Sequence, residues 1–206
     1  MDTYYDLTSS QGLLSLQQKY TVHRQCNNIC TTVLFDKKLN FETLKEAIEI
    51  AYSRSDSMRV RITKVGKVTK QYFSDSGFQA IGLLDFSGRS QEYMDKKLRK
   101  LAITRITYND RPLSKIYLLI SYDGKTGLCL VVSHMIMDSW GVTVFYKDIF
   151  EIYEALLSHS ELPKPLSSYE KLLKIDLDYA SSPKHQTDYE FWKNYLNTGE
   201  PIYTNI

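Results

Sequence analysis

Residues 116–141 read IYLLISYDGKTGLCLVVSHMIMDSWG, and a polar turn separates two apolar runs in this stretch. The pair Asp123-Gly124 is a hairpin signal, which predicts a strand over 116–120 and a returning strand over 128–132. Neither run alternates apolar with polar residues, and this lack of alternation is typical of strands that are covered on both faces. We therefore expect a hairpin at the centre of a sheet.

Outside this hairpin, strand and helix patterns alternate irregularly along the chain. A strand is expected over 29–35, and a strand pair over 58–62 and 67–73 turns near Gly66. Asn40 is the expected cap of one helix. Helices are expected over 7–17, 40–52, 90–102, 141–157, 167–179 and 187–196, the last opening with the capping box Thr187–Glu190. This order predicts an α/β (α+β) two-layer sandwich, a mixed sheet covered by helices, rather than a doubly wound sheet.

The composition excludes several classes of function. A net charge of +2 gives no reason to expect a nucleic acid partner, and the basic residues Lys96, Lys97, Arg99 and Lys100 have the pattern of a solvated helix face. The three cysteines show no CxxC spacing, so no metal site is expected. No run is long enough to cross a bilayer, and residues 1–6 do not resemble a signal peptide. We therefore expect a cytoplasmic protein without a membrane partner.

The segment Ser133–Gly141 follows the second strand of the hairpin and precedes a long helix. A neutral histidine such as His134 can take a proton from an attacking nucleophile near pH 7. From periodicity alone, His134 is more often a structural residue at such a junction. Asp138, four residues later, either contacts the imidazole, pairs with an arginine or caps the following helix. Ser133 is not expected to be a nucleophile, because no G-x-S-x-G elbow surrounds it.

This segment resembles the HHxxxDG signature of condensation domains of non-ribosomal peptide synthetases and their chloramphenicol-acetyltransferase-like relatives. Four other segments resemble motifs of that family in the same order: Leu7–Leu14 (L-T-x-x-Q-x-x-L), Arg54–Arg59 (R-H-x-x-L-R), Arg111–Leu113 (P-L before a strand) and Phe191–Leu196 (F/Y-W-x-x-x-L). Three positions depart from the family pattern. Ser133 replaces the first histidine of the signature, and Ser139 replaces its glycine. Ser55 replaces the histidine of the R-H-x-x-L-R motif.

The resemblance implies that residues 1–200 form the N-terminal lobe of a condensation domain and that 201–206 begin the linker to a second lobe. His134 is then the catalytic residue. The supporting residues of the motif are Ser133, Asp138, Arg59, Ser139, Trp140 and Gly141. By analogy, Asp138 forms a salt bridge to Arg59, and this buried pair ties the motif to a strand. Trp140 is either a packing residue or part of the wall of the tunnel between the lobes.

The resemblance also implies a reaction and its partners. A condensation domain forms an amide bond between an acyl or peptidyl thioester and an aminoacyl amine, each carried on the phosphopantetheine arm of a carrier protein. No permanently bound cofactor is expected. The isolated lobe is expected to be inactive, because the second lobe completes the tunnel. Two alternatives remain, a self-contained trimeric acyltransferase of the chloramphenicol acetyltransferase type and a non-catalytic module that binds carrier proteins.

Overall fold

The computed structural model describes residues 3–22, 25–76 and 80–199. The chain divides into two compact units, Met1–Tyr169 and Glu170–Ile206. The residues 201–206, expected to begin a linker, lie outside the described part of the chain. The lobe boundary at residue 200 therefore stays a prediction.

The first unit is built around a mixed sheet with the strand order β1-β6-β5-β4. The strands are β1 (Asn28–Phe35), β6 (Thr126–Ser133), β5 (Ser114–Ile120) and β4 (Gly82–Asp85). The expected hairpin is confirmed, since β5 and β6 pair antiparallel and Gly124 adopts a φ of +83° between them. Every residue of β6 is buried, as its unbroken apolar pattern predicts. β4 pairs parallel to β5 and was not predicted, because four residues are too few to show a period.

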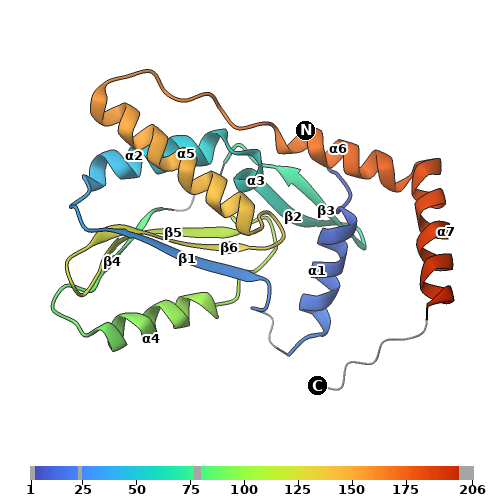
Figure 1. Cartoon of the computed structure of the whole chain (residues 1–206), viewed down its shortest axis with the longest axis horizontal. Coiled ribbons are helices and arrows are strands. Elements are labelled where there is room, and N and C mark those ends of the chain that lie inside the picture. The colour runs from blue at the N-terminus through green and yellow to red at the C-terminus, as the bar shows by residue number, and fades with distance from the viewer. Residues whose placement is uncertain (1–2, 23–24, 77–79, 200–206) are drawn as a thin grey trace. The chain divides into compact units, whose positions relative to one another are not determined.

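Helices cover both faces of this sheet (Figure 1). α2 (Phe41–Arg54) and α5 (Ser139–Ser158) pack against each other on one face, and α4 (Gln91–Ala102) lies on the other. Asn40 caps α2 as expected, because its side chain accepts hydrogen bonds from the first turn. The expected mixed sheet covered by helices is thus confirmed, and helices on both of its faces give three layers where two were expected.

A separate two-stranded sheet lies beside the main one in the first unit. β2 (Val60–Val65) and β3 (Val68–Phe73) pair antiparallel, and Gly66 turns between them with a φ of +63°. α1 (Ser9–Tyr20) begins with a capping box formed by Thr8 and Gln11. The short helix α3 (Asp56–Arg59) leads directly into β2. The strand pair expected over 58–62 and 67–73 is therefore confirmed, although residues 58 and 59 belong to α3 and the first strand begins at Val60.

The second unit consists of helical residues after Tyr169. α6 spans Tyr169–Ala180, and α7 spans Pro183–Thr198. The expected capping box at Thr187 is wrong, because α7 begins four residues earlier. Ser182 caps it and Pro183 occupies its first turn, while the Thr187 hydroxyl donates to the Pro183 carbonyl within the helix. Serine before proline is itself a helix-start signal. Here the helix begins at this signal and not at the later capping-box pattern of Thr187.

We predict that Gly127→Ala destabilises the first unit by about 1–3 kcal/mol or more. Gly127 lies in β6, where a Cβ would overlap the main-chain carbonyl of Val33 in β1. That carbonyl belongs to the sheet and cannot move without disturbing the ladder. The measurement is the urea unfolding midpoint. Gly12→Ala in α1 is the control, since no atom lies within 4 Å of its Cβ, and it should stabilise by about 0.5–1 kcal/mol. Equal midpoints for Gly127→Ala and the parent would contradict this packing.

Candidate functional site

His134 is exposed at the junction between β6 and α5. The three residues that follow it, 135–137, are buried and anchor the turn in the core. The main chain is held on both sides of the junction. The N–H of Ser133 donates to the Leu113 carbonyl at 2.8 Å, and the N–H of His134 donates to the Asn27 carbonyl at 2.7 Å. The fold therefore presents the imidazole outward from a fixed backbone, as expected from the sequence.

Two buried glutamines hold the turn after His134. The Gln11 amide donates to the Met135 carbonyl at 2.9 Å, and it also bonds to the side chain of Gln71. Gln11 and Gln71 are 3% and 0% exposed. Gln11 is part of the L-T-x-x-Q segment, so that segment acts by fixing the backbone of the motif. The contribution of Gln71 was not predicted, because only the fold brings β3 next to α1.

Asn27 is a further residue that the sequence did not single out. It is 3% exposed, and its side-chain amide donates to the Leu14 carbonyl at 2.8 Å. Its main-chain carbonyl accepts the hydrogen bond from the His134 N–H. Asn27 therefore ties α1 to the turn that carries the histidine. It precedes β1 and resembles an ordinary loop asparagine in the sequence.

Ser133 supports the turn from inside. It is 1% exposed, and its Oγ accepts a hydrogen bond from the Met135 N–H at 3.3 Å. The Tyr108 hydroxyl lies 3.4 Å from the same Oγ. Burial raises the pKa of Tyr108, and the hydrogen bond with Ser133 acts in the opposite direction. Serine in place of the family's first histidine therefore fits this interior position with its polar atoms satisfied.

The predicted salt bridge between Asp138 and Arg59 is wrong. Asp138 is exposed and caps α5, and its carboxylate accepts the Gly141 N–H at 2.7 Å. Ser139 is the first residue of α5, where serine needs no unusual dihedral. Arg59 bonds instead to Asp56 at 2.7 Å and to Asp75 at 2.5 Å. Two local carboxylates bind the terminal nitrogens of Arg59, while its buried Nε has no hydrogen-bond partner among the described residues. The exposed Asp138 is placed as a helix cap.

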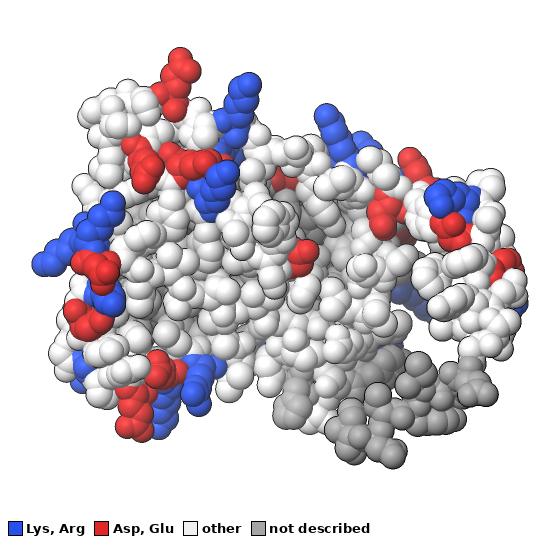
Figure 2. Space-filling view, in the orientation of Figure 1, with Lys and Arg blue, Asp and Glu red and all other residues white. Residues whose placement is uncertain are grey.

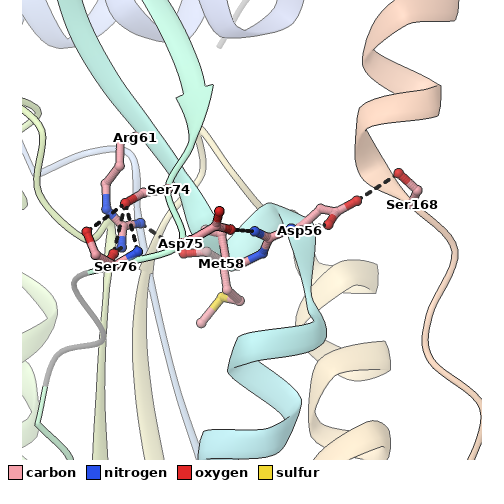
Figure 3. A network of polar contacts seen from close by, with 8 residues as sticks. Asp56, Met58, Arg61, Ser74, Asp75, Ser76 and Ser168 are labelled. Carbon is pink, nitrogen blue, oxygen red and sulfur yellow. Dashed lines mark hydrogen bonds and ion pairs between the residues drawn. The ribbon is translucent and has the colours of Figure 1, made fainter. Parts of the chain in front are cut away.

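The segment that carries Arg59 is a network of short-range polar contacts (Figure 3). Asp56 also accepts a hydrogen bond from Ser168 at 2.8 Å, on the far side from Arg61 in this view. Arg61 is 1% exposed and donates to the carbonyls of Val60 at 3.0 Å and Ser76 at 3.2 Å. These contacts fix the start of β2, but none of them involves a residue of Ser133–Gly141, so they do not tie the motif to this strand as the predicted pair with Asp138 would.

A buried ion pair does exist, between Arg54 and Asp148. The Arg54 Nε donates to the Asp148 carboxylate at 3.0 Å, and the guanidinium also donates to the Pro163 carbonyl at 2.8 Å. The two side chains are 13% and 2% exposed, respectively. Arg54 ends α2 and Asp148 lies within α5, so the pair joins the two helices on one face of the sheet. The sequence gives no signal for this pair, because its two residues lie 94 positions apart.

Trp140 does not pack into the core. Its side chain is 75% exposed at the start of α5. The interpretation of Trp140 as a packing residue is therefore wrong for the described part of the chain. Its interpretation as part of a tunnel wall stays a prediction.

We predict that Asp138→Ala costs about 1 kcal/mol of stability, because the first turn of α5 loses its cap. The urea unfolding midpoint measures this loss. Asp138→Asn is the matched control, since an amide oxygen still accepts the Gly141 N–H, and it should unfold like the parent. A loss of several kcal/mol in both variants would instead restore the idea of a buried ion pair at Asp138.

In the described ranges, no helix is long and apolar enough to cross a membrane. Among the same residues, no cluster of three or more histidine, cysteine or acidic side chains is placed to hold a metal ion. Cys26, Cys30 and Cys129 are free thiols, and Cys129 is buried as its apolar surroundings predict.

The chain is similar to parts of large peptide synthetases. A plipastatin synthase polypeptide of Bacillus subtilis (strain 168) is 22% identical over 190 residues, which make up 91% of this chain and 7% of that protein. A linear gramicidin synthase polypeptide of Brevibacillus parabrevis is 26% identical over 171 residues, or 77% of this chain and 3% of the relative. The chain thus spans a small part of the curated relatives that it matches.

Solved structures show the same fold over about half their length. The starter condensation domain of rhizomide synthetase RzmA matches with a TM-score of 0.86 at 20% identity, covering 97% of this chain and 49% of the solved chain. The first condensation domain of the calcium-dependent antibiotic synthetase, in complex with a substrate analogue, matches with a TM-score of 0.82 at 18% identity. This match covers 97% of this chain and 50% of the solved chain. A family model described as Condensation domain matches residues 1–204. The chain therefore belongs to the condensation domain family and spans about half of the solved domains that it resembles.

Proposed function

We propose that this chain is the N-terminal half of a condensation domain that joins two carrier-bound substrates through an amide bond. The observation that carries the proposal is the exposed His134 at a junction whose main chain is fixed on both sides. Ser133 and Ser139, which depart from the family signature, are both accommodated without disturbing that junction. These contacts support the proposal that His134 acts as a general base or a positioning residue.

In the proposed reaction, the amine nitrogen of the acceptor attacks the carbonyl carbon of the donor thioester. The C–N bond forms, the C–S bond breaks, and the donor arm leaves as a thiol after it takes up a proton. His134 either accepts the proton that the amine loses or holds the amine by a hydrogen bond. The two tethered reactants must meet in line, so positioning supplies a large share of the rate.

The proposal includes a second half of the domain as the partner that completes the site. α7 supports this, because it carries aromatic and aliphatic side chains that are 53–71% exposed. These residues are Tyr189, Phe191, Trp192, Tyr195 and Leu196. Phe191 and Tyr195 stack at 6.2 Å and form a continuous apolar face. Such a face is typical of an interface, and we assign it to the half that the solved domains have and this chain lacks.

The self-contained acyltransferase is less well supported. In chloramphenicol acetyltransferases the histidine motif lies near the carboxyl terminus, whereas here α5, α6 and α7 all follow His134. We also propose carrier proteins with phosphopantetheine arms as partners, no permanently bound cofactor, no partner among nucleic acids or membranes, and a location in the cytoplasm.

The test is complementation. This chain is mixed with the second half of a condensation domain and two loaded carrier proteins, and the amide product on the acceptor carrier is followed by mass spectrometry. We expect product with both halves and almost none with this chain alone. Turnover by the chain alone as a trimer would support the acyltransferase and overturn the proposal. Carrier binding without product in the complemented sample would instead indicate a non-catalytic module.

A further inference from the structure

Gln71 lies in β3 at the point where the segment before α1 pairs with this strand. Its main-chain N–H and carbonyl bond to the main chain of Tyr5, at 2.9 and 2.8 Å. Its side-chain amide donates to the Asp6 carbonyl at 2.9 Å and to Gln11 Oε1 at 2.6 Å, and its own Oε1 accepts from Gln11 Nε2 at 2.9 Å. Every polar group of this fully buried residue therefore has a partner.

Main-chain groups fix which end of each of the two amides carries the N–H groups. Gln11 Oε1 faces the Thr8 N–H, which donates to it at 2.9 Å, and Gln11 Nε2 faces the Met135 carbonyl at 2.9 Å. Gln71 Nε2 likewise faces the Asp6 carbonyl, because a carbonyl can only accept. With these ends fixed, the two amides donate to each other in one arrangement. The turn at Met135 is therefore bound by a side chain whose orientation Gln71 helps to set.

These amide contacts differ in kind from the charged contacts of the surface. Both amides are neutral and buried, so salt does not screen their hydrogen bonds. On the face shown in Figure 2, the charged side chains lie at the surface, with Lys and Arg interspersed with Asp and Glu. The pair of Lys70 with Asp6, at 2.6 Å, is also partly exposed. Lys70 precedes Gln71 in β3 and points to the opposite side of the strand, so it contacts the same segment without sharing the buried amide pair.

We propose that Gln71 is a positioning residue for the reaction, because through Gln11 it holds the carbonyl of Met135 and with it the turn that presents His134. This inference rests on the proposed function. Gln71 is 0% exposed and cannot contact the substrates, so it acts on the rate only through the position of the imidazole. A displacement of about 1 Å in a catalytic group can lower a rate by about a hundredfold. A contact distant from the reacting atoms can therefore control the rate.

Gln71→Glu is the variant that tests this role. A charged carboxylate has no N–H, so its oxygens would face the Asp6 carbonyl and Gln11 Oε1 without a hydrogen bond. We expect the single-turnover rate of the complemented domain, at saturating loaded carriers, to fall about tenfold, the scale of one or two lost hydrogen bonds. The carrier concentration at half saturation should stay unchanged, because a fully buried residue does not contact the carriers.

The pH dependence of this loss identifies the missing donor. Burial raises the pKa of a carboxyl, and below that pKa the protonated side chain again has an O–H that can donate. The ratio of the Gln71→Glu rate to the parent rate should therefore rise as the pH falls, measured where urea unfolding shows both proteins to be folded. Groups present in both proteins, such as Asp6, Lys70, Tyr169 and His134, cancel in this ratio. Gln71→Met has no group to titrate there and should be slower than the parent by a factor that does not change with pH.

Lys70→Met is the matched control, since it removes a bond to Asp6 from the neighbouring strand position and should keep the parent rate. A parent-like rate in both Gln71→Glu and Gln71→Met would overturn the inference and leave the proposed function standing. An equal loss in Lys70→Met would also overturn it, because the effect would then come from the segment before α1 in general. If Gln71→Glu does not fold, Gln71→Met carries the same comparison with the control.

A second measurement needs no product. The His134 N–H donates to the Asn27 carbonyl, and its hydrogen exchange can be followed by NMR in this chain alone. We expect the exchange to quicken about tenfold in Gln71→Glu, by the same loss of hydrogen bonds, and to stay unchanged in Lys70→Met. Unchanged exchange in Gln71→Glu would show that Gln71 does not hold the turn, and it would overturn the inference. If the parent itself forms no product when complemented, the proposed function fails, and the positioning role fails with it even where the exchange quickens.

Discussion

His134→Ala is expected to lower the rate of amide formation in the complemented domain by about 10²- to 10⁴-fold, the usual contribution of a general base. The loss should appear in the rate and not in the fold. The imidazole is exposed, and alanine keeps the main-chain N–H that donates to Asn27. Stability should therefore change by no more than about 0.5 kcal/mol. Single-turnover assays with both carriers loaded measure the rate, and urea unfolding measures the stability.

A second variant separates the two roles that His134 can have. His134→Asn keeps a polar side chain that can hydrogen-bond the amine, but it cannot take up a proton near pH 7. If the histidine acts as a base, the asparagine variant should be as slow as the alanine variant. If it only orients the amine, the asparagine variant should keep most of the rate. Turnover that survives His134→Ala unchanged would remove this residue from the mechanism.

Asp148→Ala is expected to destabilise the first unit by about 3–5 kcal/mol, because it leaves the largely buried guanidinium of Arg54, whose side chain is 13% exposed, without its carboxylate. The pair joins α2 to α5, so its loss affects the helical layer on one face of the sheet. Urea unfolding gives the free energy of unfolding. Glu151→Ala is the matched control on the same helix, since the pair of Glu151 with Lys147 is exposed and should contribute about 0.5 kcal/mol or less.

A double variant identifies the cause of that loss. Arg54→Met/Asp148→Leu removes both charges and should recover much of the stability, since apolar side chains of similar volume often replace a buried pair without cost. If Asp148→Ala alone costs less than about 1 kcal/mol, the pair contributes no more than a surface contact. In that case the packing between α2 and α5 would rest on the apolar core alone.

The parts of the fold that were predicted correctly depend on local signals. Asp123-Gly124 marks the turn between β5 and β6, and Asn40 caps α2 through hydrogen bonds to its own first turn. Each of these signals depends on groups only a few residues apart, so both partners of the contact can be identified from the sequence. The position of His134 between strand and helix follows in the same way, because each neighbouring element was identified by itself.

The parts that could not be predicted depend on partners distant in the sequence. Arg54 and Arg59 stand in one motif, and only the fold decides that Arg54 meets Asp148, which lies 94 positions away, and that Arg59 meets Asp75. Asn27 likewise gains its role from contacts with α1 and the histidine turn. The pairing of long side chains is a tertiary property, and the spacing of charges along the chain does not determine it.

The hydrogen bonds at Ser133 and His134 have a consequence for how the site can respond to its substrates. With the main chain tied to Leu113 and Asn27, the imidazole keeps only its own two side-chain torsions as freedom. Switching the histidine between idle and working orientations therefore requires a rotamer change, which is fast. In the proposed reaction, the slower steps would then be the arrival and departure of the carrier proteins.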